Sequence, residues 1–239
     1  GYSGSGKSGT RRMTVQPKII RDLTTKNSSK SLTKKSVFLV SGGARGVTAE
    51  CVVKLAQTQP CSFILLGRSN IEDEPEWAKG VGKDKTKLKL AGMKSMVDSG
   101  EKPTPAKVNQ LVVKVEAGRD IRKNLERIRN AGGNAEYVSA DVTDVKKLKT
   151  AIAAVVKKIG PVTGIIHGAG VLADKLIEKK TSDDVDAVCS TKINGMDALL
   201  KSINPKKLTH LLLFSSAAGF YGNAGQSDYA VANEALNRI

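Results

Sequence analysis

The sequence is poor in aromatic residues, in long apolar runs and in cysteine. Aromatic side chains make up 4% of its 239 residues, whereas hydrophobic residues make up 40%, so a core must be mainly aliphatic. No run of about 18 apolar residues is present, which argues against a transmembrane helix. The three cysteines, Cys51, Cys61 and Cys189, have no metal-ligand spacing and cannot all pair. We therefore expect no membrane span, no metal site and a reducing compartment, namely the cytoplasm, with a plastid as the alternative.

Acidic residues are scarce relative to basic ones. Lys and Arg number 39 against 23 Asp and Glu, which gives a net charge of +16 and raises nucleic acid as a partner. The distribution argues against that partner. Residues 1–35 hold nine of the bases, and others cluster in residues 83–89 without the interleaved aromatic residues that stack on bases. We predict a solvated basic surface, with a docking surface for an acidic partner as the alternative, and no nucleic acid.

The first 35 residues lack the pattern of a folded core. Ser, Thr, Gly and Lys dominate them, which is typical of a linker or a mobile tail, with a short extended piece near residues 15–20. The sequence starts without Met and without a signal-peptide pattern. We therefore expect the chain to be a segment of a longer protein, truncated at its C-terminus.

From residue 36 onward, apolar strands alternate with amphipathic helices. Strands are predicted at 37–40, 63–66, 135–139, 163–167 and 208–214, and helices at 48–57, 110–130, 144–159, across 175–202 and from 229. Asp144 is placed to cap its helix. Residues 70–108 carry prolines, glycines and lysines that do not fit a compact repeat, and they are predicted to be a partly helical surface insertion. The pattern indicates an α/β fold, a Rossmann-like doubly wound parallel sheet whose ligand lies beyond the carboxyl ends of the strands.

Residues 1–8, GYSGSGKS, match the phosphate-loop pattern of nucleoside triphosphate-binding proteins. That loop works because a strand enters it and a helix leaves it. No strand precedes Gly1 in the sequence, and no helical periodicity follows Ser8. We interpret the match as chance in a Gly/Ser/Lys-rich linker.

A glycine-rich turn follows the first predicted strand. Such a turn lets the backbone approach a pyrophosphate at a helix N-terminus. A plain strand-to-helix turn is the alternative. The residues predicted to hold a dinucleotide here are Ser41, Gly42, Gly43, Arg45, Gly46 and Val47.

The end of the second strand predicts which dinucleotide binds. An NAD site would carry an acid there to hold the ribose 2′-hydroxyl group, but this sequence has Gly67-Arg68-Ser69. Arg68 can pair with a 2′-phosphate, and Arg45 adds a second positive charge, so the cofactor is predicted to be NADPH. Two further strand ends are expected to line the same site, through Asp141, Val142, Gly168, Ala169 and Gly170. His167 is interpreted as a packed, hydrogen-bonded strand-end residue rather than a functional imidazole.

Residues 214–233, FSSAAGFYGNAGQSDYAVAN, are the most specific stretch. They resemble the short-chain dehydrogenase/reductase superfamily, in which a strand-end Ser and a helix-start Tyr act together. Stand-alone members carry Lys four residues after the Tyr, whereas this chain has Asn233 there and Lys192 upstream. That exchange is similar to the ketoreductase domains of polyketide and polyunsaturated fatty acid synthases, and the resemblance covers roughly residues 36–239. Thr48 departs from the superfamily turn, which has a third glycine there.

The resemblance implies roles for four catalytic residues. Tyr229 would donate a proton to a ketone, Lys192 would lower the Tyr pKa and hold the nicotinamide ribose, and Ser216 would hydrogen-bond the carbonyl oxygen. Asn233 would position a water molecule or Lys192. Tyr229 and Lys192 thereby also contact the cofactor. The implied reaction is NADPH-dependent reduction of a β-ketoacyl thioester, held on the phosphopantetheine arm of an acyl carrier protein, to the β-hydroxyacyl thioester.

The resemblance further implies neighbouring synthase domains as partners. Residues 1–35 would then be a basic linker or the remnant of a structural subdomain, and residues 36–239 an incomplete catalytic domain that is inactive by itself. Leu172-Ala173-Asp174 is similar to a signature that sets a 3R alcohol, with its first Asp replaced, so Asp174 is predicted to guide the substrate. A helix cap is the alternative role for Asp174. The alternatives for the whole chain are a stand-alone short-chain reductase and an inactive cofactor-binding scaffold domain.

Overall fold

The computed structural model describes residues 2–4, 11–13 and 31–239, and it divides the chain into two units, residues 1–31 and 32–239. In the first unit, β1 (Tyr2–Gly4) pairs antiparallel with β2 (Arg11–Met13). A phosphate loop would be followed by a helix, but β2 is a strand, which supports the interpretation of a chance match. The extended piece predicted near residues 15–20 lies outside the described residues.

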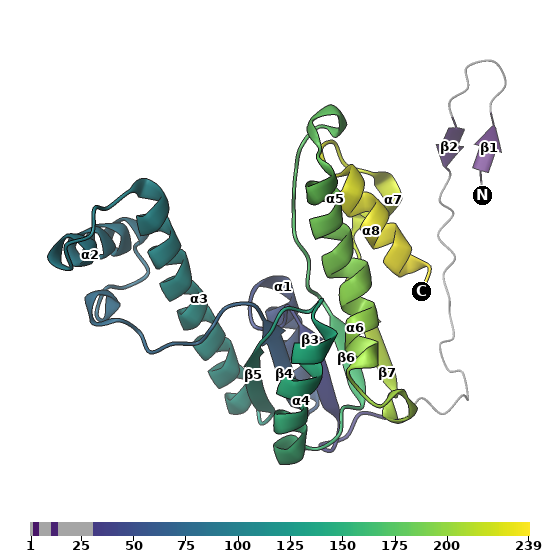
Figure 1. Ribbon diagram of the computed structural model, residues 1–239. Coiled ribbons are helices and arrows are strands. Elements are labelled where there is room, and N and C mark those ends of the chain that lie inside the picture. Colours follow the sequence, from purple (N-terminus) through teal and green to yellow (C-terminus); the bar gives the residue numbers. More distant parts are fainter. Residues whose placement is uncertain (1, 5–10, 14–30) are drawn as a thin grey trace. The chain divides into compact units, whose positions relative to one another are not determined.

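The second unit is built on a five-stranded parallel sheet of order β5-β4-β3-β6-β7 (Figure 1). Its strands are β3 (Val37–Ser41), β4 (Ser62–Gly67), β5 (Asn134–Ser139), β6 (Gly164–His167) and β7 (His210–Leu213). From the central β3, the chain adds β4 and β5 on one side. It then crosses back and adds β6 and β7 on the other side of β3. This order confirms the predicted doubly wound Rossmann-like sheet, and its switch point lies between β3 and β6.

Helices cover both faces of the sheet because the central strands are apolar on both sides. One face packs on α1 (Gly46–Thr58) and the C-terminal half of α3 (Pro105–Asn130), and its core includes Phe38 and Val40. The other face packs on α4 (Val145–Ile159) and α6 (Gly195–Lys201), and its core includes Val37 and Leu39. Successive residues of β3 therefore enter opposite cores, as strand geometry requires.

The remaining elements follow β6 and β7. After β6 the chain forms η2 (Ile177–Lys179), α5 (Ser182–Cys189) and η3 (Ser190–Asn194), a π-helical turn that continues into α6. The 3-10 helix η4 (Pro205–Lys207) then leads to β7, so this strand is shorter than the predicted 208–214. After β7 come α7 (Ala217–Tyr221) and α8 (Ser227–Asn237).

The predicted insertion forms a helical arm. It contains η1 (Glu76–Ala78) and α2 (Lys85–Asp98), and it is continuous with α3, which begins at Pro105 rather than at the predicted residue 110. The earlier start has a local cause: the Thr104 side chain accepts a hydrogen bond from Lys107 N–H, and a proline is favourable in the first turn of a helix. The arm has a small core of its own, formed by Ala78, Leu88, Val112 and Val115.

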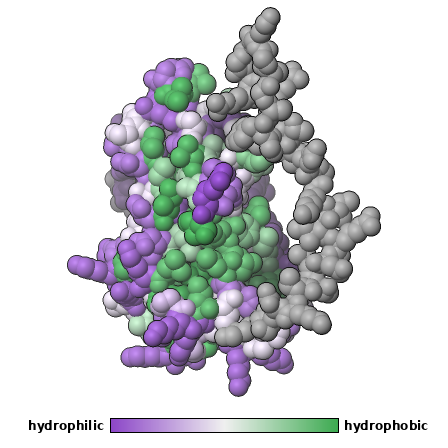
Figure 2. All heavy atoms as spheres, turned by 90° about the vertical axis from the view of Figure 1, so that its right-hand side faces the viewer, coloured by the Kyte–Doolittle hydropathy of each residue, from purple (hydrophilic) through white to green (hydrophobic). Residues whose placement is uncertain are grey.

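The outer strand of the sheet has an apolar edge. Leu211 and Leu212 on β7 are 42% and 41% exposed, and Figure 2 shows a broad hydrophobic area on this side of the molecule. Among the described residues, no helix is both long and apolar enough to cross a membrane.

Candidate active site

The glycine-rich turn between β3 and α1 lies directly against the end of β6. Gly42 has a φ of +69°, and a Cβ there would lie 2.9 Å from the backbone of Gly168 and Ala169, so only glycine fits. Thr48 packs against Gly168, because a Cβ added at Gly168 would meet Thr48 Oγ1 at 2.2 Å. Thr48 thus fills space beside β6, which gives this departure from the superfamily turn a packing role.

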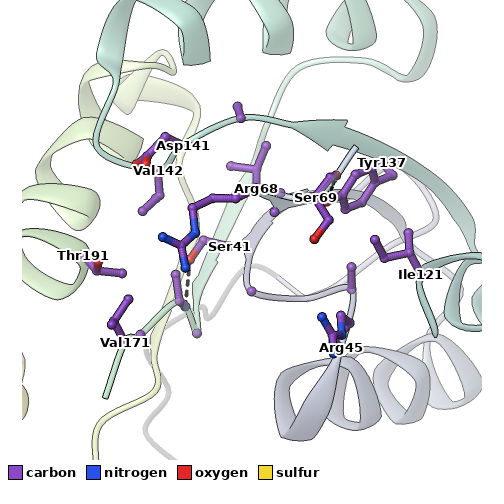
Figure 3. A pocket seen from close by; sticks show the side chains of 18 residues that line it. Ser41, Arg45, Arg68, Ser69, Ile121, Tyr137, Asp141, Val142, Val171 and Thr191 are labelled. Atoms are coloured by element: carbon purple, nitrogen blue, oxygen red, sulfur yellow. Dashed lines mark hydrogen bonds between the residues drawn. The ribbon is translucent and has the colours of Figure 1, made fainter. Parts of the chain in front are cut away.

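A cavity of about 310 Å³ opens at the carboxyl ends of the strands (Figure 3). Its size is at the lower end of ordinary ligand pockets. Of the predicted cofactor-binding residues, those that line it are Ser41, Gly42, Arg45, Arg68, Asp141, Val142, Gly168, Ala169 and Gly170. Five do not line it, namely Gly43, Gly46, Val47, Lys192 and Tyr229. Val47 is 72% exposed on the first turn of α1, whereas a Cβ at Gly170 would lie 3.2 Å from Lys192 Cε, so Lys192 borders the cavity.

Two arginines reach the cavity from different elements. Arg68 extends into it from the end of β4, and Arg45 lies at the start of α1 (Figure 3). The Arg45 Nε atom is 3.6 Å from a carboxylate oxygen of Asp120 on α3, whereas Arg68 makes no ion pair with any residue in the described part of the chain. The Arg68 guanidinium is therefore available to an anionic ligand.

The groups around the cavity suit the phosphates of a dinucleotide. The first turn of α1 contains no acid, and no side chain caps its N-terminus, so its backbone N–H groups are free for a pyrophosphate. The end of β4 offers Arg68 instead of a carboxylate. On the opposite rim, hydrogen bonds from the backbone and side chain of Thr143, and then the charge of Arg68, hold the pKa of Asp141 below its usual value despite partial burial. Arg68 and Asp141 thus present charged groups to the cavity, whose lining also includes Gly42, Gly168 and Ala169.

His167 is a buried structural residue. Its Nδ1 atom lies 2.7 Å from Ser41 Oγ, and its Nε2 atom lies 2.9 Å from the Lys192 carbonyl oxygen. A carbonyl oxygen only accepts, so Nε2 carries the proton and Nδ1 accepts from Ser41. Burial lowers the His167 pKa to about 4, which keeps the ring neutral. The interpretation of His167 as a packed, hydrogen-bonded residue is confirmed.

Ser41 extends this chain of hydrogen bonds to the segment that follows β6. Its Oγ atom also accepts from Ala169 N–H at 3.2 Å. Through Ser41 and His167, hydrogen bonds therefore connect the backbone of Ala169 to the backbone of Lys192. No sequence pattern indicates this network, because its members lie far apart in the chain.

The π-helical turn η3 places Lys192 beside Tyr229. Lys192 is 3% exposed, its Nζ atom donates to the Phe214 carbonyl oxygen at 2.7 Å, and it lies 5.9 Å from the centre of the Tyr229 ring. Burial lowers the Lys192 pKa. A single π-helical turn inside a helix is frequently found at functional sites. In stand-alone members, the resemblance places this Lys four residues after the Tyr, on the same helix. Here Lys192 reaches Tyr229 on α8 from a different element, η3.

Asn233 and Ser216 flank this pair. Asn233 is buried one turn after Tyr229; its Nδ2 donates to the Tyr229 carbonyl oxygen at 2.8 Å, and its Oδ1 has no hydrogen-bond partner among the described residues. Ser216 caps α7, where its Oγ accepts from Ala218 N–H at 3.1 Å and keeps its own proton to donate. Ser216 follows the Phe214 carbonyl that Lys192 contacts, so all four predicted catalytic residues belong to elements that meet beyond β6 and β7.

The loop after β6 is attached to the segment before Tyr229. The Asp174 carboxylate accepts a hydrogen bond from Gln226 Nε2 at 2.9 Å, and Lys175 N–H donates to the Gly225 carbonyl oxygen at 3.0 Å. Asp174 caps no helix, because the cap of α5 is Thr181 and η2 has no side-chain cap. The alternative role of Asp174 as a helix cap is therefore wrong.

Sequence reasoning missed several residues of the site. Thr191, Tyr137 and Ile121 line the cavity, and the Tyr137 hydroxyl donates to the Ser69 carbonyl oxygen at 2.7 Å. Thr191 adjoins Lys192 in the sequence, so its place at the site could have been predicted from that of Lys192. Tyr137 and Ile121 carry no local signal, since only the packing of β5 and α3 brings them to the cavity.

Comparison with known proteins agrees with this geometry. The KR domain family model matches residues 36–239. One polyunsaturated fatty acid synthase polypeptide from Thraustochytrium is 43% identical over 217 residues, which cover 88% of this chain and 8% of that protein. Polyketide synthase PksL from Bacillus subtilis is 28% identical, over 85% of this chain and 4% of that protein. The chain thus spans less than a tenth of the length of these relatives.

Solved structures give the same result. An N-terminal ketoreductase from the macrolactin assembly line superposes with a TM-score of 0.62 at 26% identity, over 87% of this chain and 33% of that one. A ketoreductase domain from the bacillaene assembly line gives a TM-score of 0.58 at 25% identity, over 83% of this chain and 37% of that one. A carveol dehydrogenase from Mycobacterium avium in complex with NAD shares the fold at 18% identity, with a TM-score of 0.59. With the family match over residues 36–239, these findings mean that the chain belongs to the KR domain family, the ketoreductase domains of polyketide and polyunsaturated fatty acid synthases.

Proposed function

We propose that this chain carries the NADPH site and the proton-donating residues for reduction of a β-ketoacyl thioester to the 3R β-hydroxyacyl thioester. The observation that carries the proposal is the pairing of Lys192 with Tyr229 beside a cavity that Arg68 enters. The membership of the KR domain family supports the same chemistry. When bound, NADPH supplies the hydride.

The residues of this chain have separate tasks in the reaction. The Tyr229 hydroxyl donates its proton to the ketone oxygen as negative charge develops there. The Lys192 ammonium group lies beside this ring, where its positive charge stabilises the negative charge left on the tyrosine oxygen after the transfer. Ser216 donates a hydrogen bond to the same ketone oxygen, which stabilises the developing charge.

Asn233 positions the group that returns a proton to Tyr229. Its Oδ1 atom is buried and free to accept a hydrogen bond from a water molecule or from the Lys192 ammonium group. Its Nδ2 atom holds the first turn of α8 through the Tyr229 carbonyl oxygen. Asn233 thereby both fixes the backbone under Tyr229 and provides an acceptor for the next proton donor.

The substrate arrives on a partner. Its class is a thioester on the phosphopantetheine arm of an acyl carrier protein, and neighbouring synthase domains are the other partners. The synthases similar to this chain support this assignment, because the chain spans only a small part of each.

Substitution of Tyr229 by Phe tests the proposal. The variant keeps the ring beside Lys192 but removes the donated proton, so reduction of a β-ketoacyl thioester in the full-length protein should fall roughly 10²-fold or more. NADPH affinity, measured by cofactor fluorescence, should stay near wild type. Tyr221→Phe is the matched control, since Tyr221 is 77% exposed on α7 and should react normally. Turnover of Tyr229→Phe at the wild-type rate would overturn the proposal that Tyr229 donates the proton, whereas the absence of turnover in the wild-type protein would favour a cofactor-binding scaffold.

A further inference from the structure

One ion pair near Tyr229 is almost completely buried. Lys180 Nζ lies 2.8 Å from Asp228 Oδ1, and the two side chains are 4% and 1% exposed. In every other ion pair between described residues, each side chain is at least 16% exposed. The Lys180 ammonium group also donates to the Ala173 carbonyl oxygen at 2.7 Å. Neither residue was singled out by the sequence, because each looks like an ordinary surface charge.

The pair joins two segments with separate tasks. Lys180 follows η2 on the segment that carries Asp174, and Asp228 lies in the first turn of α8, immediately before Tyr229. Asp228 Oδ1 also accepts from Tyr229 N–H at 2.8 Å. One carboxylate oxygen, Oδ1, therefore contacts both the Tyr229 backbone and the Lys180 ammonium group.

Among the described residues, no cation other than Lys180 forms an ion pair with Asp228. Its Oδ2 atom is buried without a hydrogen-bond partner among the described residues. Burial raises the pKa of the Cys189 thiol at the end of α5. The nearby charge of Asp228 raises that pKa further. Lys180 is thus the cation that compensates a carboxylate which the fold keeps away from water.

Stability alone is a poor reason for such a pair. Taking two charges out of water costs about as much as their attraction returns, and well-packed apolar residues often serve as well or better. A buried pair does, however, fix geometry, because neither charge can move away from the other without remaining unpaired. The location of this pair, between the substrate loop and the Tyr229 helix, indicates what that geometry is for.

We propose that Lys180 and Asp228 are positioning residues that fix the Asp174-bearing loop against the helix that carries Tyr229. The inference rests on the proposed reduction, whose stereochemistry depends on how the loop lies relative to the tyrosine. Through Ala173 and Asp228, Lys180 sets that relation directly. Neither residue touches the reacting atoms.

Three variants of the full-length protein test the inference: Lys180→Met, Asp228→Asn and the double variant. Lys180→Met leaves a buried carboxylate unpaired and is expected to fold poorly. The double variant removes both charges while keeping similar side-chain volumes, so it should fold and bind NADPH like wild type. The matched control is Lys201→Met with Asp197→Asn, an ion pair at 2.6 Å on α6 whose side chains are 61% and 56% exposed.

The product distinguishes positioning from stability. In the double variant, kcat should fall about tenfold to 10²-fold, because a misplaced reacting geometry costs that much, and the ratio of the two alcohol enantiomers should fall with it. The control should match wild type in both. If the double variant keeps both the wild-type kcat and the wild-type enantiomer ratio, the pair is only structural and the inference is overturned.

A second readout does not depend on the reaction. Backbone amide hydrogen exchange in residues 173–180, followed by mass spectrometry, should be faster in the double variant than in wild type or the control, because the tether is lost. Unchanged exchange there would overturn the inference even if the enzyme reduces β-ketoacyl thioesters. If exchange is faster in the double variant but the wild-type protein does not reduce β-ketoacyl thioesters, the positioning role of Lys180 and Asp228 is supported and the proposed function is contradicted.

Discussion

At the scale of single residues, we predict that Arg68 determines the choice of cofactor. Its guanidinium enters the cavity and makes no ion pair within the described part of the chain, so it is free to meet a 2′-phosphate. Arg68→Ala should weaken NADPH binding by about 1.5–3 kcal/mol, the value of a hydrogen bond to a charged group, and should leave NADH binding nearly unchanged. Titration of both cofactors, followed by fluorescence, measures the difference. Arg238→Ala, which removes an exposed charge just after α8, is the control. Equal losses for NADPH and NADH would refute the assignment.

His167 makes stability depend on pH. Its pKa is about 4 in the folded chain because of burial, whereas an unfolded histidine titrates near its ordinary value of 6.5. Below pH 6.5, His167 therefore binds a proton in the unfolded chain but not in the folded chain. The free energy of unfolding consequently falls as the pH falls toward 4. Linkage predicts a loss of about 2 kcal/mol between pH 7 and pH 5, measured by urea unfolding. The ordinary pKa values of Asp and Glu lie below this range, so each carboxylate contributes less than His167.

The matching variant is His167→Gln. It should be less stable than wild type at pH 7, because it loses hydrogen bonds to Ser41 and to the Lys192 carbonyl oxygen. Its stability should change less between pH 7 and pH 5, because no buried imidazole remains to be protonated. An equally steep pH dependence in the variant would show that another group titrates there.

At the scale of elements, we predict that the segment between β6 and α5 faces the substrate. Asp174 on this segment is held by Gln226, three residues before Tyr229, so it is tied to the catalytic helix. The resemblance to synthase ketoreductases predicts that a carrier-bound β-ketoacyl substrate gives the 3R alcohol, which chromatography on a chiral column resolves. Asp174→Ala should lower the 3R excess, whereas Asp183→Ala, at an exposed position on α5, should not. A predominantly 3S product from wild type would contradict this prediction.

At the scale of the whole molecule, the net charge of +16 predicts how a carrier is recognised. Acyl carrier proteins are typically acidic, so long-range attraction should favour their encounter with this chain, and salt screens such attraction. The KM for a carrier-bound substrate should therefore rise with ionic strength. A small β-ketoacyl thioester without the carrier is the control and should show no such rise. If both KM values are flat, the basic surface only keeps the protein soluble.

The sequence alone determined the order of strands and helices and the chemistry of several single residues. The apolar runs of β3 and β4 predicted buried parallel strands, because only residues covered on both faces are apolar at consecutive positions. Asp144 was predicted to cap α4 and accepts from Lys147 N–H at 3.0 Å, since capping depends on neighbours a few residues away. Gly42 and Arg68 could be predicted from their places after strands, as both lie at the carboxyl edge where ligands bind.

Only the tertiary structure decided which distant residues meet. Ser41 and His167 are 126 residues apart, and their hydrogen bond exists because β3 and β6 are neighbours in the sheet. Lys180 and Asp228 have the residue types of solvated surface charges, and they become a buried pair when the segment after β6 folds over the start of α8. Local sequence governs backbone conformation over a few residues, whereas burial and ion pairing depend on what else packs at the same place, which no local pattern records.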